Sequence, residues 1–342
     1  MIALNDITIK WRANVSANVV LKSSGDQQVE SINLAAQSTT PLVDEATQLI
    51  DDLHLAFGNH HARAVHAKGI ILEGNFAPSE AARTLSKAAV FSGPRIPVTI
   101  RFSNFTGIPN IPDNIMDANP RGMAVKLRAG GSDNLDIVNH SFNGFPVPTA
   151  REFGILLQTI ASSGAGAQKP TPLDKYLESH PIAKQFLTTQ KPPPASYATT
   201  AYYGVNSVVF VNEANKRSFV RYRFVPEAGE HYLDEASRKS MGPNYLSEEI
   251  SKRVVTTPIR FDWYAQLAAP GDKIEDPSIA WPESRATVKL GTISIERLVT
   301  DQPKADKSLL FLPGMFPAGI EAADPMFAVR EVAYPISYGE RQ

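Results

Sequence analysis

A tyrosine near the end of the chain carries the clearest chemical possibility. In REVAYPISYGERQ, residues 330 to 342, Tyr334 stands between Arg330 and Arg341, with Ser337 close by. On a helix, residues four apart share a face, so the Arg330 guanidinium group would lie beside the phenol. A nearby cation favours the phenolate, a hard anionic ligand for Fe(III), and tyrosinate is one of the few protein ligands of heme iron. A surface helix with a half-buried tyrosine explains the same residues, so motifs elsewhere in the chain are needed to choose between the two interpretations.

A second group of residues could perform acid–base chemistry. His66 lies in RAVHAKGIILEG, which we interpret as a strand, and Arg63 precedes it by three residues. The stretch IRFSN adds Arg101 and Ser103 from another expected strand. A serine hydroxyl can fix the tautomer of an imidazole by bonding one ring nitrogen, and arginines bind carboxylates with two parallel hydrogen bonds. The alternatives are a satisfied core histidine and arginines in surface salt bridges.

Alternating and helical patterns indicate the elements that must position these residues. Apolar residues alternate with polar ones at 98–102, and again in GMAVKLRAGG, SVVFVNEANKRSFVRYRFVP, RFDWYAQLAAPGD and RATVKLGTISI, which predicts strands and one hairpin. Thr149 and Glu152 form a capping box before a helical repeat, and Thr171-Pro172 opens a second helix. Strands, a helical excursion and strands again predict an α+β fold, a single antiparallel barrel with helices packed outside it.

Composition excludes several classes of function. The chain has 342 residues, with 34 Lys and Arg against 35 Asp and Glu, so no basic excess indicates nucleic acid or an anionic membrane as a partner. It has no cysteine, which excludes disulfides, thiolate heme ligation and iron–sulfur clusters. The first twenty residues show no signal-peptide pattern, and no apolar stretch approaches a membrane span. We expect a cytoplasmic protein, or a periplasmic one if a leader has been removed.

Several motifs, in order, resemble those of the heme catalase superfamily. RAVHAKG, IRFSN, NPRGMAVKL and NLDIVNHS are similar to its distal-side motifs, and the R-x-x-x-Y-P pattern at 330–335 is similar to its proximal motif. The resemblance covers roughly residues 57 to 342. It implies an eight-stranded antiparallel β-barrel of catalase type with flanking helices, in one domain over 1–342. The expected parts are an N-terminal extension (1–55), barrel halves (about 56–145 and 196–295), a helical insertion (about 149–195) and a wrapping segment with the proximal helix (296–342).

The resemblance also implies roles for individual residues. Tyr334 becomes the axial ligand of heme b, and Arg330 the cation that stabilises its phenolate. His66 becomes the distal acid–base group, which moves a proton between the two peroxide oxygens and makes water the leaving group. Ser103 orients it. The remaining residues expected to bind the cofactor are Arg63, Arg101 and Arg341 at the propionates, with Val65, Phe145, Phe153, Met326 and Ser337 around the macrocycle.

Departures from the family pattern narrow this interpretation. Catalases follow D-x-V with Gly-Asn-Asn, whose first Asn orients peroxide, whereas this chain has Asn139-His140-Ser141. His140 therefore stands at the position of that Asn, as a bulkier ring that can charge near neutral pH. Asn139 or Asn143 is the alternative source of the amide. The expected absence of a C-terminal helical domain should widen access to the heme, and the chain looks most similar to the catalase-related peroxidases, the minimal branch.

The leading hypothesis is a heme peroxidase that reduces hydrogen peroxide or organic hydroperoxides with a small-molecule electron donor, with weak catalase activity. We expect a homo-oligomer, a dimer. One alternative is a fatty-acid hydroperoxide isomerase similar to allene oxide synthases, which carry a Thr where this chain has Val65. Another is a non-enzymatic heme-binding protein, which would not need His66.

Overall fold

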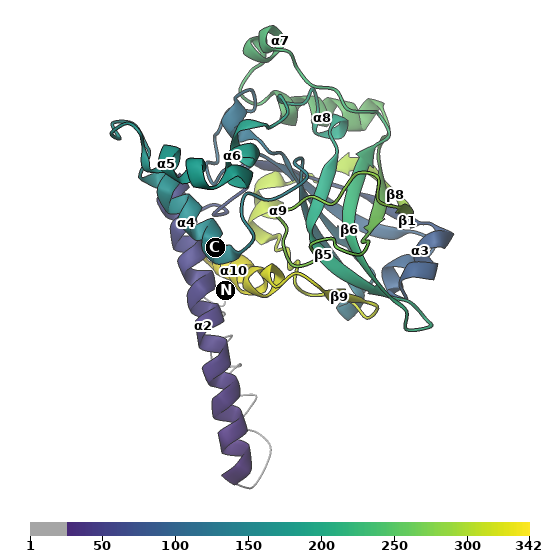
Figure 1. Cartoon of the computed structure of the whole chain (residues 1–342). Coiled ribbons are helices and arrows are strands. Elements are labelled where there is room, and N and C mark those ends of the chain that lie inside the picture. The colour runs from purple at the N-terminus through teal and green to yellow at the C-terminus, as the bar shows by residue number, and fades with distance from the viewer. Residues whose placement is uncertain (1–25) are drawn as a thin grey trace.

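Eight antiparallel strands close into a barrel (Figure 1). The structure, a computed structural model, describes residues 26–342. The expectation that the first twenty residues carry no signal peptide lies outside the described residues. The barrel strands are β1 (Gly69–Pro78), β2 (Ile96–Ser103), β3 (Gly122–Leu127), β4 (Leu135–His140), β5 (Tyr202–Val211), β6 (Arg217–Pro226), β7 (Ile259–Leu267) and β8 (Thr287–Leu298). β1 pairs with β8, and His140 at the end of β4 pairs with Tyr203 of β5, which closes the ring. A short strand, β9 (Ile320–Ala322), pairs with the other half of β5.

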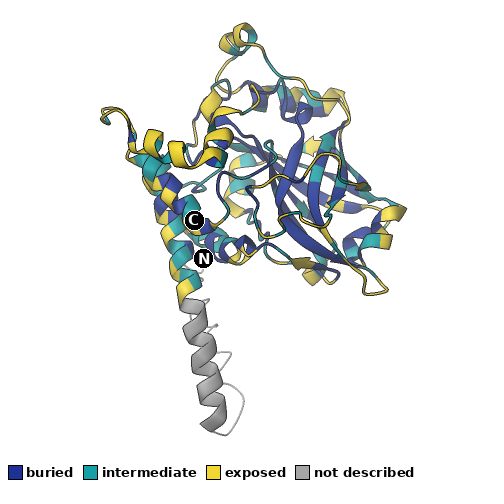
Figure 2. Ribbon diagram, in the orientation of Figure 1, coloured by how far each residue is buried: buried dark blue, intermediate teal, exposed yellow. Residues whose placement is uncertain are grey.

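The alternation seen in the sequence determines which face of each strand is buried. Val98, Ile100 and Phe102 point into the barrel with the apolar residues of β3 and β4. Phe76 and Phe224 pack against Trp263 in the interior, with ring centroids 5.2 and 5.5 Å away. Burying each such side chain contributes about 1.5–3 kcal/mol. Figure 2 shows the resulting band of buried residues along the strands. The predicted hairpin and all the predicted strands of these segments are confirmed.

Helices cover the outside of the barrel. They are α2 (Asp26–Phe57), α3 (Glu80–Leu85), α4 (Ala150–Ala161), α5 (Pro172–Ser179), α6 (Pro181–Thr188), α7 (Glu235–Ser240), α8 (Tyr245–Thr256), α9 (Gln302–Ser308) and α10 (Met326–Glu340), with short 3-10 turns η1 (Ala89–Phe91), η2 (Met116–Ala118), η3 (Gly131–Asp133) and η4 (Tyr197–Thr199). Thr149 caps α4 by accepting from the Glu152 amide, which is one of the two contacts of the predicted capping box, and Thr171 caps α5 as predicted. In the described part of the chain, no helix has the length and apolar character that spanning a membrane requires.

Three helices form a layer beside one face of the barrel. The described side chains of α2 pack against α4 and α10 through a second apolar cluster that includes Ile50, Leu53, Leu157 and Val332. Figure 1 shows α2, α4 and α10 together on one side of the strands, although α10 comes from the far end of the sequence. The space between this layer and the outer face of the barrel holds the candidate site. The division of the chain into the five expected stretches stays a prediction.

The strand expected around His66 is wrong. β1 begins only at Gly69, and His66 lies in the preceding loop with φ +57°. This left-handed conformation costs about 1–2 kcal/mol for a residue with a side chain. Tertiary hydrogen bonds compensate for that cost: the His66 amide donates to the Phe105 carbonyl at 3.0 Å, and the His66 carbonyl accepts from Arg101 Nη1 at 2.8 Å. Strain held this firmly is typical of functional positions.

Candidate active site

A cavity of about 200 Å³ lies between the outer face of β2 to β4 and the helices α2, α4 and α10. Its wall is mostly apolar, with Leu49, Ile50 and Leu53 contributed by α2. Every residue predicted for the site lines it: Arg63, Val65, His66, Arg101, Ser103, Asn139, His140, Phe145, Phe153, Met326, Arg330, Tyr334, Ser337 and Arg341. The fold thus brings together residues that are spread over most of the sequence.

On the wall formed by α10, Tyr334 and Arg330 are in contact. Arg330 Nη2 donates to the Tyr334 hydroxyl oxygen at 3.0 Å, and the guanidinium group lies 5.4 Å from the centre of the phenol ring. Both residues belong to α10, one turn apart, as the spacing predicts. The phenol oxygen therefore has a guanidinium group as its hydrogen-bond partner.

Arg330 is itself held from the barrel side. Its Nη1 donates to Asn206 Oδ1 at 2.7 Å, and Asn206 Nδ2 donates to Asp324 Oδ2 at 2.8 Å. Asp324 is 1% exposed, and burial raises the pKa of its carboxyl group. The Asp324 carboxylate also accepts from the backbone amide of Met326, at the start of α10. This chain of contacts fixes both α10 and the guanidinium group beside the phenol.

On the barrel wall, His66 is oriented by Ser103. Ser103 Oγ lies 3.0 Å from His66 Nδ1, and the Phe105 ring stands edge-on to the imidazole with the ring centroids 5.5 Å apart. Burial, followed by the nearby His140 and Arg101, lowers the pKa of His66 to about 3. The imidazole is therefore neutral at physiological pH. Among the described residues its Nε2 has no hydrogen-bond partner, so that nitrogen is available to a ligand in the cavity.

Asn139 and His140 point to opposite faces of β4. Successive residues of a strand alternate between faces, and Asn139 follows Ile137 on the face that forms the barrel core. Its amide Nδ2 donates to the Met123 carbonyl at 3.2 Å. Asn139 thus borders the cavity with its amide turned toward the barrel. The structure does not bring this amide to His66, because the strand register places it on the other side of the sheet.

His140 lies on the cavity side and is neutral. It pairs across the sheet with Gly122, and a Cβ atom at that glycine would point at the His66 ring. Burial, followed by the charge on Arg330, lowers the pKa of His140 to about 4. The expectation that this ring charges near neutral pH is therefore wrong, since the solvent that would stabilise an imidazolium is excluded.

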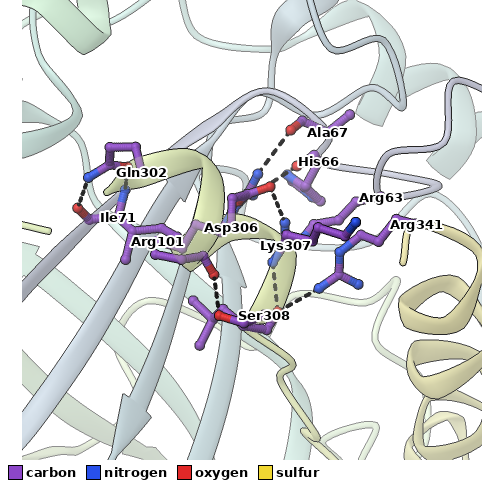
Figure 3. A network of polar contacts seen from close by, with 12 residues as sticks. Arg63, His66, Ala67, Ile71, Arg101, Gln302, Asp306, Lys307, Ser308 and Arg341 are labelled. Carbon is purple, nitrogen blue, oxygen red and sulfur yellow. Dashed lines mark hydrogen bonds and ion pairs between the residues drawn. The ribbon is translucent and has the colours of Figure 1, made fainter. Parts of the chain in front are cut away.

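Three arginines that line the cavity lie close together (Figure 3). Arg63 and Arg101 each contact one oxygen of Asp306 on α9, at 2.6 and 2.7 Å, and Arg341 donates to the Leu309 carbonyl at 2.6 Å. Burial, followed by repulsion from Arg101, lowers the pKa of Arg63 to about 8, and burial lowers the pKa of Arg341 to about 10. The cluster carries three positive charges against one negative charge. It is suited to a ligand with two carboxylates.

These features fit heme. The mostly apolar lining suits the macrocycle, the excess of two positive charges suits its two propionates, and a tyrosine oxygen is among the protein ligands that hold heme iron. Arg341 Nε and His140 Nε2 are also buried without a partner among the described residues. Buried donors normally have partners, and both of these atoms belong to residues that line the cavity.

Sequence reasoning missed Asn206, Asp306 and Asp324. Asp306 stands in PKADKS, where nothing separates it from a surface carboxylate, and Asp324 follows two alanines with no visible pattern. Asn206 did carry a signal, because a polar residue inside β5, a strand buried throughout, needs an explanation. Its amide supports the arginine that contacts the phenol.

Comparisons with known proteins show the family to which the chain belongs. Residues 23–341 match the family model for Catalase. The chain is 30% identical to a catalase-related peroxidase of Synechococcus elongatus, over 100% of this chain and 99% of that protein. It is 33% identical to a catalase-related peroxidase of Mycolicibacterium paratuberculosis, over 80% of this chain and 87% of that one. The crystal structure of a fungal catalase superposes with a TM-score of 0.72 at 19% identity, covering 82% of this chain and 59% of the other, which confirms the fold. The chain belongs to the catalase family, a family of heme-containing oxidoreductases.

Proposed function

We propose that this protein is a heme b peroxidase that reduces hydrogen peroxide or organic hydroperoxides with electrons from a small external donor. The observation that carries the proposal is the presence of a neutral imidazole, His66, and a phenol–guanidinium pair, Tyr334 and Arg330, on two walls of one cavity. The two relatives described above, both catalase-related peroxidases, support it.

The side chains divide the work between binding and proton transfer. Tyr334 would hold the iron, with Arg330 stabilising the phenolate, while Arg63, Arg101 and Arg341 would hold the propionates. When bound, the heme would supply the two electrons that break the O–O bond. His66 would accept the proton of the inner peroxide oxygen at Nε2 and return it to the outer oxygen, and Ser103 would accept from Nδ1–H to keep Nε2 free for this task.

The overall reaction consumes one hydroperoxide and two donor molecules. ROOH and two AH give ROH, water and two donor radicals A•, so the two hydrogen atoms lost by the donor appear in the products. The apolar wall formed by Leu49, Ile50 and Leu53 suits an organic R group, while hydrogen peroxide is the case in which R is hydrogen. A homodimer in the cytoplasm stays part of the proposal, to be checked by sedimentation and by cell fractionation.

The test compares two activities of the heme-loaded protein. We expect oxidation of a phenolic donor by both peroxides, with oxygen evolution from hydrogen peroxide about 100-fold or more below that of a full-length catalase. The reason is that dismutation needs a second peroxide oriented by an amide beside His66, and misplacement by about 1 Å can cost on the order of 100-fold. Here the Asn139 amide faces the barrel.

The assay measures oxygen release and donor oxidation side by side, with a full-length catalase as the reference. Oxygen evolution at full catalase rates with little donor oxidation would place the protein among the catalases. A heme-loaded protein that neither evolves oxygen nor oxidises the donor would contradict the proposed peroxidase function.

A further inference from the structure

His140 is presented to the cavity by the geometry of the sheet. It is the last residue of β4 and lies in register with Gly122 of β3. A Cβ atom at Gly122 would fall 2.4 Å from Ser103 Oγ and 2.6 Å from His66 Nδ1. Because cross-strand partners point to the same face, His140 projects on the side of the sheet where Ser103 and His66 meet. The missing side chain at Gly122 leaves room for the His66 ring.

The backbone fixes which nitrogen of His140 carries the proton. The amide of Phe142 donates to His140 Nδ1, with the nitrogen atoms 3.3 Å apart. A ring nitrogen that accepts a hydrogen bond is unprotonated, so in the neutral ring the proton lies on Nε2. This histidine is neutral because it is buried, with 8% of its surface exposed. The ring therefore offers one N–H donor at Nε2.

That donor has no partner among the described residues. His140 Nε2 is buried and unpaired, and the ring packs against Phe145 and Phe186, with centroid distances of 6.3 and 6.1 Å. The aromatic neighbours hold the ring in place and offer no oxygen or nitrogen to accept from it. A buried donor without a partner is unfavourable unless a ligand supplies the acceptor.

His66 and His140 are complementary. His140 accepts from the Phe142 amide at Nδ1, which leaves Nε2–H as a donor. His66 contacts Ser103 through Nδ1, and in the tautomer in which Nδ1–H donates to Ser103 its Nε2 is an acceptor. A peroxide has both a proton to give and lone pairs to share. One imidazole of each kind, side by side on a barrel face, meets both requirements.

We infer that His140 is a second catalytic residue, whose Nε2–H donates a hydrogen bond to the bound peroxide while His66 takes the proton from its inner oxygen. The inference rests on the proposed function. It identifies the hydrogen-bond donor beside His66 in a chain whose Asn139 amide faces the barrel. His140 transfers no proton: the proton that His66 removes from the inner oxygen returns to the outer oxygen as the O–O bond breaks. The donor serves this first step and does not position a second peroxide.

Fluoride binding to the ferric heme protein tests the donor without turnover, because a bound anion is stabilised by a distal hydrogen-bond donor. We expect His140→Asn, which keeps an N–H donor, to bind fluoride within about threefold of the parent. We expect His140→Phe, which keeps an aromatic ring and loses the donor, to bind it about tenfold more weakly, as the loss of one hydrogen bond implies. His180→Phe, at an exposed histidine between α5 and α6, is the matched control and should match the parent.

The dissociation constants are read from the absorption change of the heme, alongside its resting spectrum and the melting temperature of each variant. Should His140→Phe fail to retain heme, His140→Gln and His140→Leu give a second pair with and without a donor. Equal fluoride affinity for the donor and non-donor variants, in proteins that bind heme and oxidise donors, overturns this inference and leaves the proposed function intact. A parent protein that binds no heme would instead overturn the proposed function.

Discussion

Tyr334→Phe is expected to abolish stable ferric heme binding. Among the described residues that line the cavity, Tyr334 alone offers an oxygen that can become an anionic iron ligand. The change removes that oxygen and leaves Arg330 with an apolar ring where it had an acceptor at 3.0 Å. Loss of a residue that only supports a metal ligand already costs about 10–100-fold in affinity, so loss of the ligand itself should cost more than about 100-fold. The measurement is a heme titration of the apoprotein followed by absorption.

The matched control is Tyr338→Phe, one turn further along α10. Tyr338 also lies beside an arginine, with the Arg341 guanidinium group 4.6 Å from the ring centre, but it does not line the cavity. A phenylalanine keeps that ring, so the control should bind heme with the parent's affinity and spectrum. An unaltered heme spectrum in Tyr334→Phe would end the assignment of the axial ligand.

His66→Ala is expected to retain heme and to react with peroxide about 100-fold to 10⁴-fold more slowly, the usual contribution of a positioned acid–base group. Heme should stay bound because His66 supplies neither the iron ligand nor a propionate partner. Because the pKa of His66 is about 3, its imidazole stays unprotonated across the assay range, and the parent's rate should be nearly constant between about pH 5 and 8. Stopped-flow absorption measures the second-order rate constant.

His60→Ala is the control for His66→Ala. His60 lies six residues earlier in the same connection and is exposed, and its ring nitrogen Nε2 lies 2.8 Å from the Phe57 carbonyl oxygen. Its removal should leave the reaction rate within about twofold of the parent. If His66→Ala reacts within a few-fold of the parent while His60→Ala does the same, His66 is a structural residue. A parent rate that falls with a midpoint near pH 6.5 would contradict the lowered pKa.

Local patterns allowed the clearest predictions from sequence. Arg330 and Tyr334 are four residues apart on a helix, so their contact follows from helix geometry alone. The strands followed from two-residue alternation, and the cap of α5 from Thr171 and the proline after it. The family resemblance added the roles of residues that lie far apart in the sequence. Agreement among several ordered motifs made that resemblance reliable.

The parts that sequence could not reveal depend on contacts made across long stretches of chain. Asn206 meets Arg330 across 124 residues, and Asp306 meets Arg101 across 205. The left-handed turn at His66 needs hydrogen bonds from Phe105 and Arg101 that exist only once β2 is in place. Alternation does separate Asn139 from His140, but only the closed barrel shows which face of β4 borders the cavity.

The arginine cluster of Figure 3 bears on how the protein is maintained in a cell. Arg63, Arg101 and Arg341 repel one another, and Asp306 neutralises only one of their charges. A newly made chain therefore reaches its full stability only when a dianion enters the cluster, since a ligand that binds the folded state alone stabilises it by mass action. Chains without the cofactor are then expected to spend more time unfolded, where proteases can remove them. Cofactor supply, rather than synthesis alone, is then expected to set the cellular abundance of this protein.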